Sequence, residues 1–161
     1  MLKKLIYYLV QAAKDQPNLN TVMLHDIYRL NHLPDIKYGA FVIETEQGVN
    51  TDSLFRFNLI LYYVDRLTSD KKNMLDIQST GIDVLHNILV SLPEEVDLIS
   101  STYRVFDQKF KDDCAGAYVS VSLDVPVNYT CDEDDESVGD FNLDFNEDFL
   151  IDISESWKTI M

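Results

Sequence analysis

The apolar residues at the start of the chain recur at the spacing of one helix face. Lys3, Lys4 and Lys14 lie off this stripe, so the segment also has a polar side. The pattern predicts an amphipathic helix over residues 2–14, which Pro17 ends. Its apolar stripe consists of Leu2, Leu5, Ile6, Leu9, Val10 and Ala13.

The next stretches favour extended chain. Residues 21–24 are apolar and predicted to be extended, whereas residues 26–30 fit either a strand end or one helical turn. Residues 38–45 are rich in β-forming side chains and predict a strand, followed by a turn over residues 47–52. A longer strand is predicted over residues 53–65, because one face alternates as Phe55, Phe57, Leu59, Leu61 and Tyr63.

After this strand, the spacing of the apolar residues changes from that of a strand to that of a helix. Thr68 and Asp70 are of the types that cap helix N-termini, and Pro93 ends the pattern. We therefore expect a helix over residues 70–92, with an apolar stripe of Leu75, Ile82, Leu85, Ile88, Leu89 and Leu92. Gly81 weakens such a helix, and we expect a close packing contact with the sheet to account for it; a simple kink is the alternative.

Two further alternating segments predict a β-hairpin. Residues 101–110 alternate as a half-exposed strand, and residues 111–116 form a turn. Residues 118–127 then alternate, with Val119, Val121, Leu123 and Val125 on one face. The order of elements predicts an α+β fold: a mainly antiparallel sheet flanked by two helices on one face.

The last thirty residues differ in composition from the rest. Residues 132–161 hold eleven acidic residues and one lysine, a net charge of −10, which leaves −5 for residues 1–131. We therefore predict an α+β domain over residues 1–131 and an acidic extended arm over residues 132–161. Large apolar residues alternate along the arm, interrupted by one four-residue step: Phe141, Leu143, Phe145, Phe149, Ile151 and Ile153.

This alternation makes the six apolar residues candidate anchors for a strand-like arm. Such an arm would dock on a sheet edge or groove, of its own domain or of a neighbouring copy. An unfolded, solvated tail is the alternative, because acidic segments of low complexity are usually unfolded alone.

The overall composition narrows the class of protein. The chain has 161 residues, of which 46% are hydrophobic, enough for the core of one domain. A net charge of −15 argues against a nucleic-acid binder, which needs lysine and arginine to neutralise phosphates. The apolar run over residues 5–10 is too short for a signal peptide, and no stretch approaches the roughly 20 residues of a membrane span. We expect a soluble intracellular chain with reduced cysteines.

No group of residues predicts catalysis, a cofactor or a metal site. Acidic neighbours of Cys114 are expected to raise the pKa of its thiol and suppress its reactivity. The acidic run over residues 132–136 lacks the spacing of a calcium-binding loop, and the glycines are isolated. The histidines lie in three separate segments, at His25, His32 and His86. We therefore predict that the chain is not an enzyme.

Several short stretches together resemble the small neck and tail-completion proteins of tailed bacteriophages, and most of all the ring proteins of crAss-like phages. The resemblance covers about residues 1–131. The stretches that carry it are Asn20–Val22 leading to Asp26–Tyr28, Ile36–Ile43, the strand over 55–65, the long helix, Phe106–Phe110, and Asp113–Gly116 with the strand up to Pro126.

The resemblance implies a tail-terminator-like fold and a structural role in the virion. Such proteins form homo-oligomeric rings, sixfold or twelvefold, that join the portal to the tail beside other neck and tail ring proteins. Genome DNA passes through without specific binding, which an acidic chain would suit. The chain would be made in the cytoplasm of the host bacterium and contact no membrane.

Two other functions remain open at the level of sequence. An acidic protein of this size could mimic DNA and inhibit a nucleic-acid enzyme. However, two thirds of the net charge, −10 of −15, lies in the arm and not on a folded face. A small enzyme or ligand-binding domain is the third option, and no polar constellation supports it.

Overall fold

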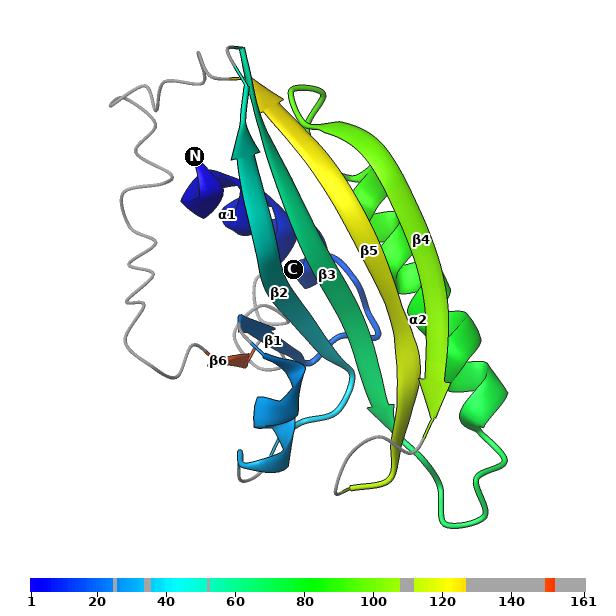
Figure 1. Ribbon diagram of the computed structural model, residues 1–161. Coiled ribbons are helices and arrows are strands. Elements are labelled where there is room, and N and C mark those ends of the chain that lie inside the picture. Colours follow the sequence, from blue (N-terminus) through cyan, green and yellow to red (C-terminus); the bar gives the residue numbers. More distant parts are fainter. Residues whose placement is uncertain (25, 34–35, 52, 108–111, 127–149, 153–161) are drawn as a thin grey trace.

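The computed structural model describes residues 1–24, 26–33, 36–51, 53–107, 112–126 and 150–152. Figure 1 shows the helices and strands within these ranges. In chain order they are α1 (Leu2–Lys14), β1 (Thr21–Leu24), the 3-10 helix η1 (Ile27–Asn31), β2 (Ala40–Asn50), β3 (Leu54–Arg66), α2 (Met74–Val90), β4 (Asp97–Asp107), β5 (Cys114–Pro126) and β6 (Leu150–Asp152).

The described strands form one sheet in the order β4-β5-β3-β2-β1-β6. β1 and β2 pair in parallel, and the other neighbouring strands pair antiparallel. The chain passes from β3 through α2 to β4, and β5 then lies between those two strands. The predicted fold class is confirmed: an α+β fold with a mainly antiparallel sheet flanked by two helices.

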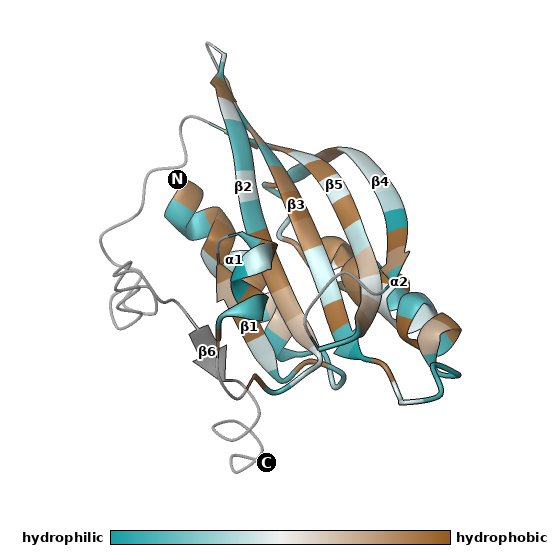
Figure 2. Cartoon of the chain, turned by 60° about the horizontal axis from the view of Figure 1, so that its bottom comes forward, coloured by the Kyte–Doolittle hydropathy of each residue, from teal (hydrophilic) through white to brown (hydrophobic). Residues whose placement is uncertain are grey.

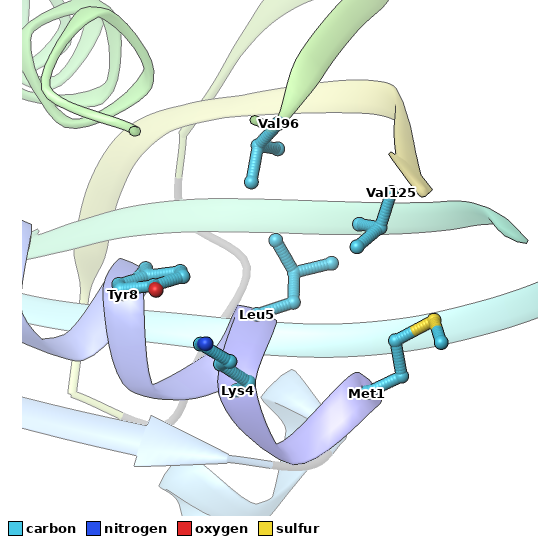
Figure 3. Close-up of a pocket in the computed structure, with 6 residues that line it drawn as sticks. All are labelled: Met1, Lys4, Leu5, Tyr8, Val96 and Val125. Carbon is cyan, nitrogen blue, oxygen red and sulfur yellow. The ribbon is translucent and has the colours of Figure 1, made fainter. Parts of the chain in front are cut away.

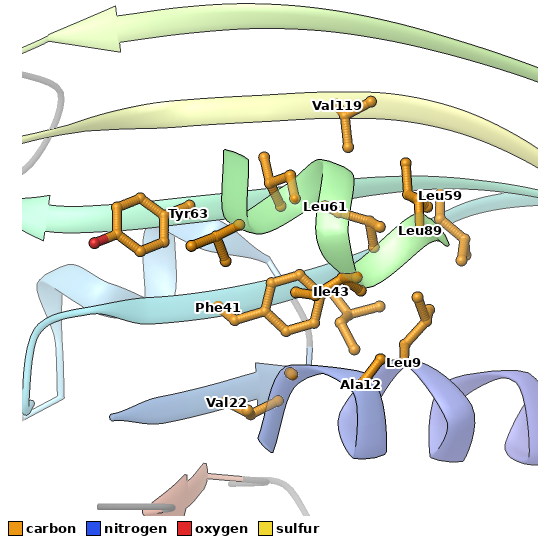
Figure 4. Close-up of a cluster of buried hydrophobic side chains, with 14 of the residues drawn as sticks. Leu9, Ala12, Val22, Phe41, Ile43, Leu59, Leu61, Tyr63, Leu89 and Val119 are labelled. Atoms are coloured by element: carbon orange, nitrogen blue, oxygen red, sulfur yellow. The ribbon is translucent and has the colours of Figure 1, made fainter. Parts of the chain in front are cut away.

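Both helices pack on one face of this sheet and build the main core. α1 has the bounds that its apolar stripe predicts and buries most of that stripe, although Leu2 is exposed. The alternating face predicted for β5 is buried in the same core. Figure 4 shows the centre of the core, where labelled side chains of the helices and the sheet meet: Leu9, Ala12, Val22, Phe41, Ile43, Leu59, Leu61, Tyr63, Leu89 and Val119.

A smaller cluster covers part of the opposite face. η1 supplies Ile27 and Leu30, and β1 supplies Met23. These side chains pack on residues of the sheet that point away from the main core: Ala40, Val42, Val64, Phe106 and Cys114. Of the two alternatives for residues 26–30, the helical turn is confirmed.

Gly81 lies where α2 approaches the sheet most closely. A Cβ atom at this position would stand 2.9 Å from Tyr63 Cδ1 and 3.0 Å from Ala117 Cβ. Real Cβ atoms avoid such distances, so only glycine fits without a shift of α2. The predicted packing contact between Gly81 and the sheet is confirmed.

The predicted turn over residues 47–52 is wrong. β2 continues to Asn50, and Gly48 pairs with Phe57 of β3. The register shifts between Thr45 and Gln47, which marks a β-bulge, so the alternation of the strand is interrupted without the strand ending. The chain turns after Asn50 instead.

Three elements begin four residues away from their predicted starts. α2 begins at Met74 rather than at residue 70, because Lys71 has a φ of 56°, which no residue within a right-handed helix adopts. β4 begins at Asp97 and so includes four residues before the predicted start. β5 begins at Cys114, inside the predicted turn.

Candidate interaction surface on α2 and β4

Helix α2 carries apolar residues on its outer side as well as on its inner side. Leu75 is 72% exposed, Ile82 37% and Val90 69%. At about 100° per residue, Val90 lies opposite Gly81 in the buried face of the helix, whereas Leu75 and Ile82 lie on the flank, roughly 100–120° from Gly81. The prediction that Leu75 and Ile82 belong to the buried stripe is therefore wrong, although Leu85, Ile88 and Leu89 of that stripe are buried.

Strand β4 is the edge of the sheet on the same side of the molecule. It is 11 residues long and pairs with β5, and no other described strand lies beside it. Most of its residues are exposed, including Leu98, Ile99 and Val105. An edge strand of this length exposes backbone N–H and C=O groups along its outer side, and a strand of another chain can join them.

The outer side of α2 and β4 belong to one continuous surface. Gln78 Nε2 of α2 donates a hydrogen bond to the backbone oxygen of Phe106 in β4, at 3.2 Å. Further along, Tyr103 Oη of β4 lies 3.5 Å from His86 Nδ1 of α2. Figure 2 shows the two elements side by side, with hydrophobic and hydrophilic bands alternating along the helix.

We call this region the α2–β4 surface and define it by Leu75, Ile82, Val90, Leu98, Ile99 and Val105. These are six of the nine large apolar residues that are exposed among the described residues. Single exposed apolar residues are common on protein surfaces, but their concentration on two adjacent elements is typical of protein–protein interfaces. Together with the open edge, they make this region the candidate functional site.

The opposite edge of the sheet is formed differently. β1 has only four residues, all of them buried, and β6 pairs with it antiparallel. In the backbone register, Thr21 pairs with Asp152, Val22 with Ile151, and Met23 with Leu150. A segment of the acidic arm thus extends the sheet at this edge.

Of the predicted anchors, the structure describes the backbone of Ile151, which lies in β6 and pairs with Val22. The other five, Phe141, Leu143, Phe145, Phe149 and Ile153, lie outside the described residues. The same holds for His25, Cys131 and the acidic run over residues 132–136.

The open part of the face opposite the helices is polar. Arg56 donates two hydrogen bonds to Asp124, from Nε to Oδ1 and from Nη2 to Oδ2, both at 2.7 Å. These bonds lower the pKa of the Asp124 carboxyl, which is 3% exposed, and raise the pKa of the Arg56 guanidinium. Ser122 Oγ donates to Asn58 Oδ1 at 2.7 Å in the neighbouring cross-strand pair. In both pairs the two side chains are hydrogen-bonded to each other, and the pairs link β3 to β5.

Two further titratable groups in the described part of the chain are Cys114 and Tyr38. Cys114 is buried, and burial is the main cause that raises the pKa of its thiol; Asp112 adds to the effect, as predicted. Tyr38 Oη donates to Asp112 Oδ2 at 2.6 Å. Among the described residues, no group of three or more His, Cys, Asp or Glu could hold a metal ion.

A small apolar cavity lies between the start of α1 and the sheet. Figure 3 shows the side chains around it: Met1, Lys4, Leu5, Tyr8, Val96 and Val125. Its volume of about 10 Å³ is comparable to the space for one water molecule. This cavity is too small for a metabolite. Neither α1 nor α2 combines the length and apolar character that a membrane-spanning helix needs.

Comparison with known proteins adds no family: no protein-family model matches the chain, and no curated protein matches it either.

Proposed function

We propose that the chain is a structural protein of a tailed-phage virion, where it forms a ring in the neck or tail. The ring would connect the portal to the tail and let the genome pass. The observation that carries the proposal is the α2–β4 surface, where an open 11-residue edge adjoins exposed apolar side chains. The resemblance of residues 1–131 to phage ring proteins is the reason for proposing a ring in a phage neck or tail.

A closed ring needs two different surfaces on each copy, because each subunit contacts one neighbour on each side. The sheet has two unlike edges that meet this need. β4 is long and open, whereas β1 is short and followed by β6. This difference favours head-to-tail contacts over a symmetric dimer.

The charge of the chain supports the passage of DNA. With a net charge of −15, the protein would repel phosphates, so the genome could slide without being held. Its partners would be further copies of itself, the portal and other neck or tail ring proteins. The protein would be made in the host cytoplasm and incorporated into the virion.

Native mass spectrometry of the full-length chain tests the proposal. We expect a closed species of six or twelve subunits. Val105→Lys and Val90→Lys place a charge in the α2–β4 surface and should shift the population toward monomers. Val49→Lys is the matched control, because Val49 is 44% exposed on β2, away from this surface, and should leave the oligomer intact.

A wild-type chain that stays monomeric at all concentrations tested would contradict self-assembly into a ring. Equal effects of all three lysine substitutions would contradict the assignment of the interface to α2 and β4. In the first case the DNA-mimic alternative becomes the next hypothesis, and competition with duplex DNA for a basic enzyme would test it.

A further inference from the structure

We propose that, in the assembled ring, strand β6 of one copy pairs with strand β1 of the neighbouring copy. The inference rests on the proposed function, since it describes how ring subunits are joined. It concerns the edge opposite the α2–β4 surface and therefore uses different residues.

The pairing itself is independent of which copy supplies β6. Three residue pairs join β6 to β1, from Thr21 with Asp152 to Met23 with Leu150. An equivalent β6 from a neighbour forms the same backbone ladder on the same β1. Exchange of an identical element between copies therefore creates an intersubunit contact without new complementary surfaces.

The chain between β5 and β6 is long enough for this exchange. Through the strand register, Leu150 stands level with Tyr118 of β5, eight residues before Pro126 and four strands away. At ~3.3 Å per residue and ~4.8 Å per strand, Pro126 and Leu150 are about 33 Å apart within one copy. The 24 residue steps between them can span about 80 Å. The connection thus has more than twice the length that a contact within one copy requires.

The acidic charge of the connection between β5 and β6 also favours exchange with a neighbouring copy. Residues 127–149 contain nine acidic residues and no lysine or arginine. Repulsion among like charges opposes compaction of a linker and extends its reach. A connection stretched over a longer distance would keep these charges farther apart than one that spans about 33 Å.

β6 can pair with its own β1 or with the β1 of a neighbouring copy, and assembly reduces the entropic advantage of its own β1. In an isolated chain, the tether gives β6 a high effective concentration beside its own β1. In a ring, the neighbour's β1 would be held at a fixed position, and the same tether would reach it wherever that position lies within about 80 Å of Pro126. Exchange would then lower the charge repulsion within the connection. It would also link each subunit to its neighbour through the arm.

Disulfide trapping with two single-cysteine variants tests the exchange. Val22→Cys and Ile151→Cys stand opposite each other in the register, and residues opposed in an antiparallel ladder have a Cα separation that a disulfide can bridge. Both variants carry Cys131→Ser and are co-expressed at full length with tags of different mass. After mild oxidation, we expect a disulfide-linked dimer that contains one copy of each variant.

Two controls make the result specific. Ile151→Cys paired with Val49→Cys, at an exposed site on β2 away from β1, should give no dimer. Thr21→Cys with Asp152→Cys offers a second pair in the same register, in case the first substitution impairs folding.

The outcomes separate the two proposals. A ring in native mass spectrometry, with no mixed dimer from either pair and a purely intrachain disulfide in the Val22→Cys, Ile151→Cys double variant, overturns the exchange and leaves the ring. Absence of any oligomer of the wild-type chain overturns the proposed function itself.

Discussion

Gly81 of α2 and Tyr63 of β3 are in such close contact that the missing Cβ of the glycine is what allows the helix to lie on the sheet. The added atom would stand 2.9 Å from Tyr63 Cδ1. Tyr63 is itself almost fully buried, so its ring has little room to move. The distance between α2 and the centre of the sheet is therefore set by this pair.

We expect Gly81→Ala to lower the free energy of unfolding by about 1–3 kcal/mol, the usual effect of overpacking a core. Alanine is the better helix former by about 1 kcal/mol, so propensity alone has the opposite sign. Urea unfolding followed by circular dichroism measures the difference. Ser79→Ala, at an exposed position of the same helix, should be neutral or stabilising; equal destabilisation by both changes would contradict the steric explanation.

The Arg56–Asp124 pair should make stability depend on pH. Its hydrogen bonds hold the pKa of folded Asp124 below the ordinary value of 3.8. The stabilisation is then complete above that unfolded-state pKa and is lost as pH falls through the lowered pKa of the folded state. We expect Asp124→Asn to lower the free energy of unfolding by about 1–3 kcal/mol near neutral pH.

The difference between wild type and Asp124→Asn should shrink as the pH of the unfolding experiment is lowered below about 4. Asp107→Asn is the matched control, because Asp107 is exposed at the end of β4. Its effect should be small at every pH. A pH-independent difference for Asp124→Asn would mean that packing, and not charge, explains the loss.

Removal of the acidic arm should separate folding from assembly. A chain that ends at Cys131 keeps α1, α2 and strands β1–β5, which hold both apolar clusters. We expect its circular dichroism spectrum to keep the helix and strand signals, while its ring dissociates or weakens in native mass spectrometry. A truncated chain that still enters virions normally would contradict a role for the arm.

The full-length chain should not bind duplex DNA at physiological salt. With a net charge of −15, the chain as a whole repels the phosphates of the duplex. An electrophoretic mobility-shift assay with random duplexes should show no retarded band. A retarded band whose intensity falls with salt would contradict a conduit that lets DNA slide.

The sequence predicts elements well where the signal is local. The bounds of α1 follow from an uninterrupted stripe and a following proline, and the buried face of β5 follows from strict alternation. The turn predicted around Gly48 failed because a bulge imitates the end of a strand. Such a bulge depends on the partner strand, which local patterns do not include.

The candidate site could be predicted only in part. Leu75 and Ile82 are seven residues apart and pass for members of the buried stripe, although at about 100° per residue they project to the flank of the helix, roughly 100–120° from Gly81. That projection, centred on the glycine, was the available signal. The open edge of β4 had none, because strand order follows from pairing between distant residues, such as Leu54 with Pro126.

The position of β5 between β3 and β4 also sets the timing of folding. β4 is synthesised before β5 but has no sheet to join until β5 has been inserted beside β3. The pairing of Leu54 with Pro126 closes a long loop, a non-local step that slows folding. A contact made through β4 is therefore available only on a domain whose sheet is complete. Assembly through this edge would select finished subunits and leave unfinished ones out of the ring.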